Sequence, residues 1–307
     1  MENEVVEKLT EILRLANFSQ EKLAQTIGVS FATLNSWINA RSIPHPKHKT
    51  LIEDLYKKYT GQFTISSEEL LIKQQKILDF CKNENIFEKI VNRKDLLDEF
   101  ILKLTYNSNR IEGSTLTEAE TAKVIFTDIA LTNKSLREQI EAKNHQAAFM
   151  FILKLIKEKQ VLNEKIILRI HEILMNGILP EAGFYRNHPV RIVGTRVLTA
   201  NFIKVPFLME NLDKELLSMP QNIIRQITKI HADFEKIHPF ADGNGRTGRL
   251  VMQMMALINN LPPILILDKN KHFYYTALSK AQIDSDYSLL EDFIMDTMLE
   301  TIKIIQN

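Results

Sequence analysis

Residues 238–249 bring together side chains that could bind a phosphate group and move a proton. His238 is a candidate general base, because an imidazole exchanges a proton near neutral pH. Asp242 offers a carboxylate oxygen, the type of ligand that Mg²⁺ prefers. Arg246 and Arg249 lie three residues apart on one side of a helical turn, and guanidinium groups grip phosphate oxygens in a fork. The segment therefore combines a base, a metal ligand and an anion-binding pair.

The glycines of this segment match the sequence pattern of a dinucleotide-binding fingerprint but not the structural context that it requires. Gly243, Gly245 and Gly248 give G-x-G-x-x-G, but that fingerprint requires a β-strand before the glycines. The apolar residues from Ile223 to Ile237 recur instead at helical spacing. A P-loop fails as well, because the lysine and the Ser or Thr that should follow Gly248 are missing. Both standard nucleotide motifs are therefore excluded.

What remains is a helix, a glycine-rich loop and a second helix. Pro239 disfavours helical geometry at the residue before it, so the first helix should end at His238 and leave the imidazole at the loop mouth. The second helix should begin near Arg246, and its first turn offers unpaired N–H groups to an anion. The glycines let a phosphate approach the backbone closely, and Asn244 adds an amide donor.

The whole run from His238 to Arg249 resembles the Fic motif, H-x-F-x-[DE]-G-N-G-R-x-x-R, with every defined position present. Gly183-Phe-Tyr-Arg186 with the segment 190–195 resembles the family's approach to a flap over the active site, and Tyr274-Tyr275 resembles its C-terminal helix. The resemblance covers about residues 160–300.

A second motif lies upstream. Ser108, Glu112 and Gly113 match [ST]-x-x-x-E-[GN], which resembles the inhibitory motif of the class whose inhibitory helix precedes the Fic fold. The resemblance implies that Glu112 reaches Arg249 and takes the space of the γ-phosphate, and that Ser108 fixes the carboxylate. A purely local capping or pairing role for Glu112 stays open.

The family resemblance implies a protein adenylyltransferase, which transfers AMP from ATP to a Ser, Thr or Tyr hydroxyl and releases pyrophosphate. The implied cofactors are ATP and Mg²⁺, and the partner is a target protein, which includes the chain itself. The implied roles are a base at His238, a metal ligand at Asp242, phosphate contacts at Gly243, Asn244, Gly245, Arg246 and Arg249, a nucleotide pocket at Tyr274 and Tyr275, and a target clamp at Arg191, Ile192, Val193, Gly194 and Thr195.

Three other functions stay open. The same fold could use another donor, although Arg249 favours a triphosphate. It could act as a nucleotide sensor in a DNA-binding regulator. Removal of AMP would use the same loop together with Glu112. A homodimer also stays open.

Composition favours a mostly helical protein, since 307 residues contain only nine glycines and nine prolines. The formal charge of +1 gives no strong overall field for nucleic acid or membrane. A single cysteine, Cys81, excludes an internal disulfide framework, and no apolar run approaches the ~20 residues that span a bilayer. We therefore expect a cytoplasmic protein without membrane contact.

The predicted fold class is all-α, with three parts. Residues 1–59 form a helix-turn-helix unit, residues 60–160 a helical region with the inhibitory motif, and residues 161–307 the Fic core. The β-branched stretch 190–198, divided by Gly194, predicts a small β-hairpin flap.

The N-terminal unit resembles the Cro and phage-repressor type of helix-turn-helix over residues 19–38. Ser19 and Ser30 are predicted N-caps, and Gly28 makes the turn between the helices. From Lys22 to Ile52 there are four basic residues, Lys22 included, and no acid, which favours DNA contact through residues 19–49. Phe31, Ala32, Asn35 and Ser36 are the base-facing candidates. A role in protein contacts is the alternative, because residues 1–58 as a whole carry only +1.

Overall fold

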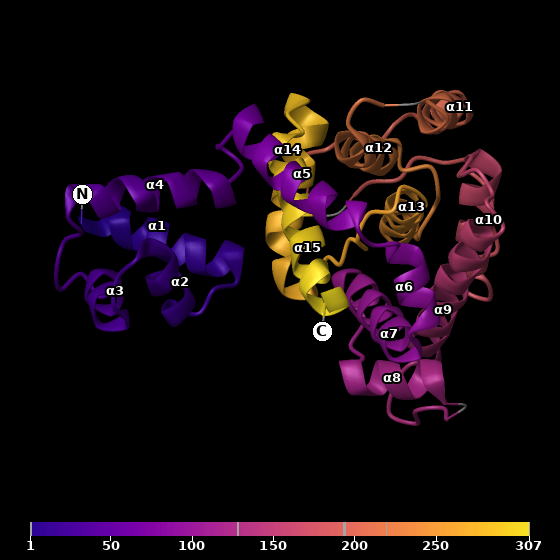
Figure 1. Cartoon of the computed structure of the whole chain (residues 1–307), viewed down its shortest axis with the longest axis horizontal. Coiled ribbons are helices and arrows are strands. Elements are labelled where there is room, and N and C mark those ends of the chain that lie inside the picture. The colour runs from indigo at the N-terminus through magenta and orange to yellow at the C-terminus, as the bar shows by residue number, and fades with distance from the viewer. Residues whose placement is uncertain (1, 128, 193–194, 219, 307) are drawn as a thin grey trace. The chain divides into compact units, whose positions relative to one another are not determined.

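The computed structural model describes residues 2–127, 129–192, 195–218 and 220–306, and Figure 1 shows helices joined by loops. The described residues form fifteen α-helices, two short 3-10 helices and no strand, so the all-α prediction is confirmed. The helices are α1 (Glu2–Ala16), α2 (Gln20–Ile27), α3 (Phe31–Ile38), α4 (Pro46–Tyr59), α5 (Ser67–Lys82), α6 (Ile86–Asn92), α7 (Lys94–Ile111), α8 (Glu118–Phe126), α9 (Leu136–Lys157), α10 (Glu164–Met175), η1 (Phe202–Lys204), α11 (Val205–Leu216), α12 (Ile223–Ile237), α13 (Asn244–Ile258), η2 (Asp268–Asn270), α14 (Lys271–Asp284) and α15 (Ser288–Gln306).

The chain divides into two compact units. One consists of Met1–Ser67 with Lys269–Leu290, and the other of Glu68–Asp268 with Glu291–Asn307. The glycine-rich loop belongs to the second unit, whereas α14 belongs to the first. The predicted boundaries at residues 59 and 160 were drawn from sequence motifs, whereas these two units are defined by how compactly the chain packs. The boundaries therefore stay predictions.

The first unit contains a short helix-turn-helix whose ends are set by local sequence. Ser19 accepts a hydrogen bond from the backbone N–H of Lys22 at 3.1 Å, and Ser30 accepts one from that of Thr33 at 3.2 Å. Between the two helices Gly28 adopts φ +78°, a left-handed conformation that glycine reaches without a steric penalty. The caps and the turn predicted from the sequence are therefore confirmed. The core beneath them is apolar and built from Leu9, Ile12, Ala16, Leu23, Ala24, Ile27, Leu34, Trp37 and Ile52.

The second unit is built around α13, which Figure 1 shows among α6, α7, α9, α10 and α12. Almost every residue of α13 is buried, including its polar ones. A helix that is apolar on nearly all sides belongs in the middle of a core, and Leu250 to Leu257 is apolar except for Gln253, which is bonded to the backbone of Ile264. Polar side chains on such a helix need partners inside the protein, so Arg246 and Arg249 at its start must be satisfied by neighbouring helices.

The predicted β-hairpin requires a correction. The described residues 190–192 and 195–198 contain no strand, and Val193 and Gly194 lie outside the described residues. The two arms are joined through a side chain, because Thr199 Oγ1 donates to the carbonyl oxygen of Val190 at 2.8 Å. Arms this short form an isolated hairpin of marginal stability, so β-branched residues alone do not produce a ladder.

None of the helices in the described part of the chain has both the length and the apolar character that a bilayer crossing demands.

Candidate active site

His238 stands directly after α12, at the mouth of the glycine-rich loop, as predicted. It caps the helix with φ 52° and ψ 62°, and its backbone N–H donates to the carbonyl oxygen of Phe234 at 2.9 Å. A left-handed conformation is unfavourable for a residue with a Cβ atom, so the surrounding contacts must hold it. Pro239 explains why the helix cannot continue past this point.

The environment of the His238 ring favours a neutral imidazole with a free acceptor. Its Nδ1 lies 3.2 Å from the carbonyl oxygen of Glu235. A carbonyl only accepts, so the ring proton sits on Nδ1 and Nε2 keeps its lone pair. Burial lowers the pKa of His238 below its ordinary value; the Glu235 carbonyl opposes this, the Arg186 charge adds to it, and Glu112 and Asp242 oppose it more weakly. The residue is therefore a proton acceptor at neutral pH.

The loop after His238 is closed by its own amide side chain. Asn244, which is 2 % exposed, accepts from the N–H of Phe240 at 2.8 Å and donates back to its carbonyl oxygen at 2.9 Å. This side chain was predicted to donate a hydrogen bond to a phosphate, but in the structure its amide is hydrogen-bonded within the loop. Its contact with phosphate stays a prediction.

His171 of α10 supports the same loop from below. Its ring stacks on Phe240 with centroids 3.6 Å apart, and it bridges the N–H of Gly183 at 2.9 Å and the carbonyl oxygen of Asp242 at 3.0 Å. Because Nδ1 accepts from an N–H, Nε2 carries the proton and donates. Burial lowers the pKa of His171 to about 4.

Arg186 is a buried residue that sequence reasoning did not place in the site. Its Nε donates to the carbonyl oxygen of His238 at 2.7 Å, and its Nη2 donates to that of Ile237 at 3.3 Å. Nη1 donates to the carbonyl oxygen of His188 at 2.9 Å. Arg186 is 4 % exposed. Its hydrogen bonds connect His238, the candidate base, to the segment before the predicted flap. An arginine at a fixed place after Gly183 was the available signal, and it was noted only as part of the resemblance.

Arg249 joins α13 to the end of α7. Its Nη2 donates to Glu112 Oε1 at 2.7 Å and to the carbonyl oxygen of Ser108 at 3.0 Å, while its Nε donates to Ser108 Oγ at 3.0 Å. The predicted pairing of Glu112 with Arg249 is thus present as a contact. The expectation for Ser108 was different, since it was to fix the carboxylate. Both of its oxygens instead accept from the guanidinium, which offers donors where Glu112 offers none.

The carboxylate of Glu112 lies against the first turn of α13. A Cβ atom built on Gly245 would collide with Glu112 Oε1 and would come within 3.1 Å of Arg249 Nη1, so only glycine leaves room for this arrangement. The start of a helix attracts negative charge, which Glu112 supplies here. Gly113 follows with φ +102° and ends the helix, as predicted.

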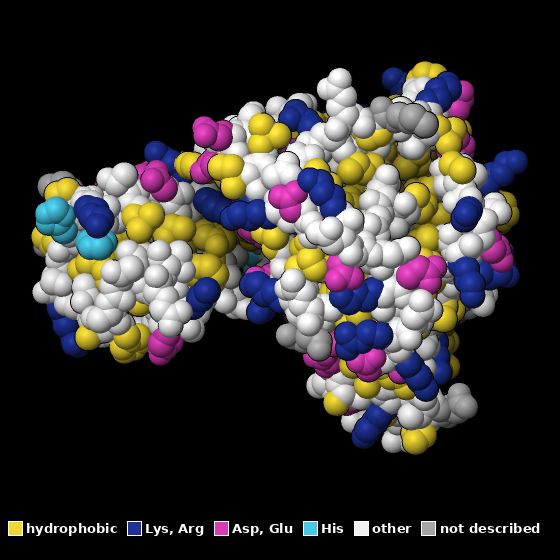
Figure 2. Space-filling view, viewed as in Figure 1, with side chains coloured by type: hydrophobic (Ala, Val, Ile, Leu, Met, Phe, Trp, Pro, Cys, Tyr) yellow, Lys and Arg dark blue, Asp and Glu magenta, His cyan; other side chains and the backbone are white. Residues whose placement is uncertain are grey.

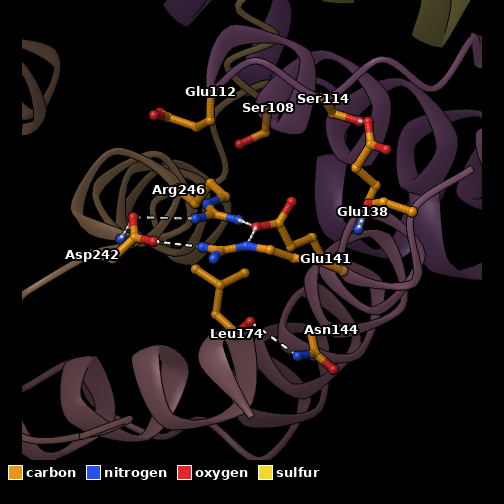
Figure 3. A network of polar contacts seen from close by, with 12 residues as sticks. Ser108, Glu112, Ser114, Glu138, Glu141, Asn144, Leu174, Asp242 and Arg246 are labelled. Carbon is orange, nitrogen blue, oxygen red and sulfur yellow. Dashed lines mark hydrogen bonds and ion pairs between the residues drawn. The ribbon is translucent and has the colours of Figure 1, made fainter. Parts of the chain in front are cut away.

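Arg246 belongs to a closed ring of four charged side chains (Figure 3). Its Nη1 lies 3.1 Å from Glu141 Oε1 and its Nη2 lies 3.5 Å from Asp242 Oδ1. Arg137, one turn before Glu141 on α9, completes the ring, with Nε 3.2 Å from Glu141 Oε1 and Nη2 2.9 Å from Asp242 Oδ2. Sequence reasoning missed both α9 residues. Their spacing of four on one helix was the only signal, and it is common to surface ion pairs.

The donor set at Asp242 fits a magnesium ion that is shared with phosphates. Magnesium usually takes one or two carboxylates and completes its shell with water and phosphate oxygens. The Asp242 side chain is 46 % exposed at the loop mouth, and Arg137, its partner at Oδ2, is itself 60 % exposed. Within the described residues no cluster of three His, Cys, Asp or Glu side chains could hold a metal ion by itself. An ion held by Asp242 would therefore need further ligands beyond such a cluster.

Glu235 lies beneath the loop and is not used by either network. It is 5 % exposed, and burial raises the pKa of its carboxyl to about 8, with Arg249 acting against this shift and Glu112 adding to it. Its Oε1 would be 2.6 Å from a Cβ atom built on Gly248. The third glycine of the motif therefore makes room for a buried carboxyl group.

The remaining predicted residues lie elsewhere. Tyr274 is buried and Tyr275 is 40 % exposed, on α14 of the first unit, so their place in a nucleotide pocket stays a prediction. Arg191 is exposed, and Ile192 and Thr195 are partly exposed. The clamp role of these flap residues also stays a prediction.

Comparison with known proteins agrees with these features. Residues 161–256 match the Fic/DOC family, and residues 9–59 match a helix-turn-helix family. A protein named protein adenylyltransferase Fic from Drosophila erecta is 26 % identical over 282 residues, covering 85 % of this chain and 56 % of its own length. One of the same name from Nematostella vectensis is 32 % identical over 200 residues, covering 61 % and 45 %. The chain thus spans about half the length of the curated relatives it matches.

Solved structures share the fold. A Fic family protein from Desulfovibrio desulfuricans superposes with a TM-score of 0.65 at 25 % identity, covering 78 % of this chain and 74 % of that one. Fic-1 from C. elegans superposes with a TM-score of 0.67 at 17 % identity, covering 97 % of this chain and 96 % of that one. Residues 161–256 of this chain therefore resemble the Fic/DOC family, and residues 9–59 resemble a helix-turn-helix family.

Proposed function

We propose that this protein is an adenylyltransferase that transfers AMP from ATP to a Ser, Thr or Tyr hydroxyl of a protein, and that Glu112 inhibits the transfer. The observation that carries the proposal is the contact of Arg249 with Glu112 at 2.7 Å, next to a complete Fic motif. The names of the curated relatives support the reaction class.

In the proposed reaction the target hydroxyl oxygen attacks the α-phosphorus of ATP. A new oxygen–phosphorus bond forms, the bond to the bridging oxygen of the β-phosphate breaks, and pyrophosphate leaves. His238 Nε2 takes the hydroxyl proton, because its neutral ring keeps a lone pair on that atom. The N–H group of Gly245 at the start of α13 stabilises negative charge that moves during the transfer, and that of Gly243 could do so only after it leaves Asp242 Oδ1.

Asp242 would hold the magnesium ion that accompanies ATP. When bound, such an ion neutralises phosphate charge and favours departure of pyrophosphate. The protein's own contribution at this point is Arg246, whose side chain is 5 % exposed and whose Nε has no hydrogen-bond partner among the described residues. A buried donor without a partner is costly, so this Nε is suited to a phosphate oxygen.

The inhibition follows from charge and space. Glu112 neutralises Arg249, whose guanidinium would otherwise bind the γ-phosphate. The two carboxylate oxygens also repel a phosphate that approaches the same place. ATP can then bind only in a pose in which its γ-phosphate does not contact Arg249, and this pose does not support transfer.

Intact mass spectrometry after incubation with ATP and Mg²⁺ tests the proposal. Wild type, Glu112→Gly and His238→Ala are compared, and self-modification is read as a gain of one AMP. We expect the largest gain for Glu112→Gly and none for His238→Ala or for the double variant. An absence of AMP in every variant, with ATP binding demonstrated, would refute the reaction. Equal gains for wild type and Glu112→Gly would refute the inhibition alone.

A second proposed function is DNA binding by the helix-turn-helix unit. Phe31 and Ala32, at the start of α3, are exposed, as a helix that enters a major groove requires. Figure 2 shows histidine side chains beside basic ones on this unit. Asn35 and Ser36 are partly buried and bond to Gln20 and Ser42, so they are less free than expected.

A selection of binding sites from random duplex DNA, followed by a mobility shift at increasing salt, tests this second function. We expect a selected sequence whose affinity falls as salt rises, because Lys and Arg contacts release counterions. Arg41→Gln should weaken binding, and Arg169→Gln in the second unit is the matched control. Selection of no sequence by wild type would refute DNA recognition.

A further inference from the structure

The four-membered ring around Asp242 uses two residues of α9 that lie outside the Fic motif. Glu141 Oε1 accepts from Arg137 Nε at 3.2 Å and lies 3.1 Å from Arg246 Nη1, so one carboxylate oxygen anchors both arginines. Asp242 faces the same two guanidinium groups with its two oxygens, at 2.9 Å and 3.5 Å. In Figure 3 Arg246 lies between Asp242 and Glu141.

The two arginines of the ring differ in exposure, and this difference separates their roles. The Arg246 side chain is 5 % exposed, and its place in the first turn of α13 fixes it. Arg137 is 60 % exposed and reaches the ring from the rim. An exposed ion pair contributes little free energy and exchanges readily with solvent, so the Arg137 contact is the one that can open.

The contact that can open involves Asp242 Oδ2, an oxygen of the proposed metal ligand. A guanidinium and a divalent cation compete for a carboxylate oxygen, because both are attracted by the same negative charge and one lone-pair direction cannot serve both. Oδ1 of the same carboxylate already accepts from the N–H of Gly243 at 2.7 Å. Oδ2 is therefore the oxygen that Arg137 has to release.

We propose that Arg137, anchored by Glu141, is a built-in counter-cation of Asp242 that competes with the divalent metal for this carboxylate. The inference rests on the proposed function only in taking Asp242 as the metal ligand. Arg137 balances Asp242 in the nucleotide-free protein and swings away from it when a metal-bound nucleotide arrives. Glu141 is the positioning residue, since it keeps Arg137 at the rim after release.

A binding titration tests the competition without any transfer of AMP. In the Glu112→Gly background, the affinity for α,β-methylene-ATP is measured at a series of Mg²⁺ concentrations. Arg137→Gln should lower the Mg²⁺ concentration at which half of the gain in affinity for α,β-methylene-ATP is reached. The decrease should be about 2–5-fold, the range that a single exposed ion pair supports. Glu141→Gln should raise this concentration, because Asp242 is then the anionic partner that Arg137 keeps among the described residues. Lys154→Gln, which removes an exposed cation paired 3.9 Å from Glu158 on the same helix, is the matched control.

Arg137→Lys separates competition from a general effect of charge. An ammonium keeps the positive charge but cannot reach Glu141 and Asp242 with two separate donors as the guanidinium does. A Mg²⁺ requirement that falls in Arg137→Lys as in Arg137→Gln supports the proposal. A requirement that stays at the wild-type level in Arg137→Gln, or one that Arg137→Gln and Lys154→Gln change equally, would overturn it. An affinity that does not respond to Mg²⁺ in any variant would also overturn it, whereas the mass measurement of AMP transfer is independent of that result.

Discussion

Glu112 directly follows α7 as its C-cap, Arg249 stands in the second turn of α13, and their side chains meet at 2.7 Å across 137 residues of sequence. Arg249 is 6 % exposed at its side chain and Glu112 is 33 % exposed. The buried partner is held by its own helix and by Ser108, so Glu112 is the partner that can leave. The structure therefore contains a contact that a ligand could break from one side.

The length of the Glu112 side chain sets the inhibition. Glu112→Asp should relieve it in part and Glu112→Gly fully, because a carboxylate one methylene shorter cannot keep 2.7 Å to Arg249 without a shift of the helix end. We expect the rate of self-modification to rise in the order wild type, Glu112→Asp, Glu112→Gly. Glu118→Asp, on the surface of α8, is the control and should leave the rate unchanged. An Asp variant with less activity than wild type would contradict the argument.

The rate of AMP transfer should tolerate mild acid. Burial holds the pKa of His238 below its ordinary value, so the ring stays neutral and able to accept a proton at pH values where a free histidine is already charged. In Glu112→Gly, the transfer rate should therefore stay level as pH falls from about 7.5 through about 6.5, the ordinary histidine pKa, and decline only below that. Initial rates in a constant ionic-strength buffer series measure this. A midpoint at or above the ordinary histidine pKa would count against the buried base.

The fold should lose stability in acid because of its buried histidines. Burial lowers the pKa values of His145 and His231 to about 3 and that of His171 to about 4, from 6.5. Between pH 6.5 and 4 the unfolded chain binds more protons than the native one, so stability falls as pH falls. The slope approaches about 1.4 kcal/mol per pH unit for each such group. Melting temperatures should decrease from about pH 7 to about pH 4.5, and a flat profile would contradict the neutral, buried state of these rings.

Glu235 acts in the opposite direction. Its carboxyl has a pKa raised to about 8, so the native state binds the extra proton between pH 4.5 and 8 and stability falls as pH rises through that range. Glu235→Gln should remove this loss and raise the melting temperature at about pH 8.5 relative to wild type, with a smaller difference at about pH 5.5. Equal differences at both pH values would show that the carboxyl does not titrate in this range.

Gly248→Ala should destabilise the protein although alanine is the better helix former. Its methyl group would stand 2.6 Å from Glu235 Oε1 and 3.1 Å from Phe234 Cδ1, inside a packed core. Overpacking of this kind costs about 1–3 kcal/mol, more than the ~1 kcal/mol that helix propensity returns. Urea unfolding of Gly248→Ala, Glu235→Ala and the double variant measures the coupling. The double variant should be more stable than the sum of the single effects, and simple additivity would contradict the clash.

Local sequence predicted most of the elements but not the contacts between them. Ser19 sets a helix start through a side-chain cap, and Gly28, Gly113 and Pro239 set helix ends through backbone conformation. These ends were predicted because each effect involves only near neighbours in the sequence. The start of α13 at Asn244 came two residues earlier than expected, since Asn244 bonds back into the loop and lets the helix begin there.

The parts that were missed depend on partners distant in sequence. Arg137 and Glu141 look like an ordinary surface pair until α9 packs beside α13. Arg186 bonds to backbone carbonyl oxygens, which carry no sequence signal at all. The hairpin at 190–198 was predicted from β-branched residues, and the lack of a partner strand among the described residues outweighed that propensity.

The left-handed conformation of His238 costs conformational free energy, while the proposed reaction needs the histidine side chain at this position. A glycine or an asparagine would occupy φ 52° at lower conformational cost, so a His238→Gly or His238→Asn chain should gain backbone stability while losing the proton acceptor. A screen that rewards only thermal resistance would therefore drift toward inactive proteins at this position. The same argument helps to find active sites in other chains. A residue other than glycine that occupies an unfavourable backbone conformation is a candidate for a role that depends on its side chain.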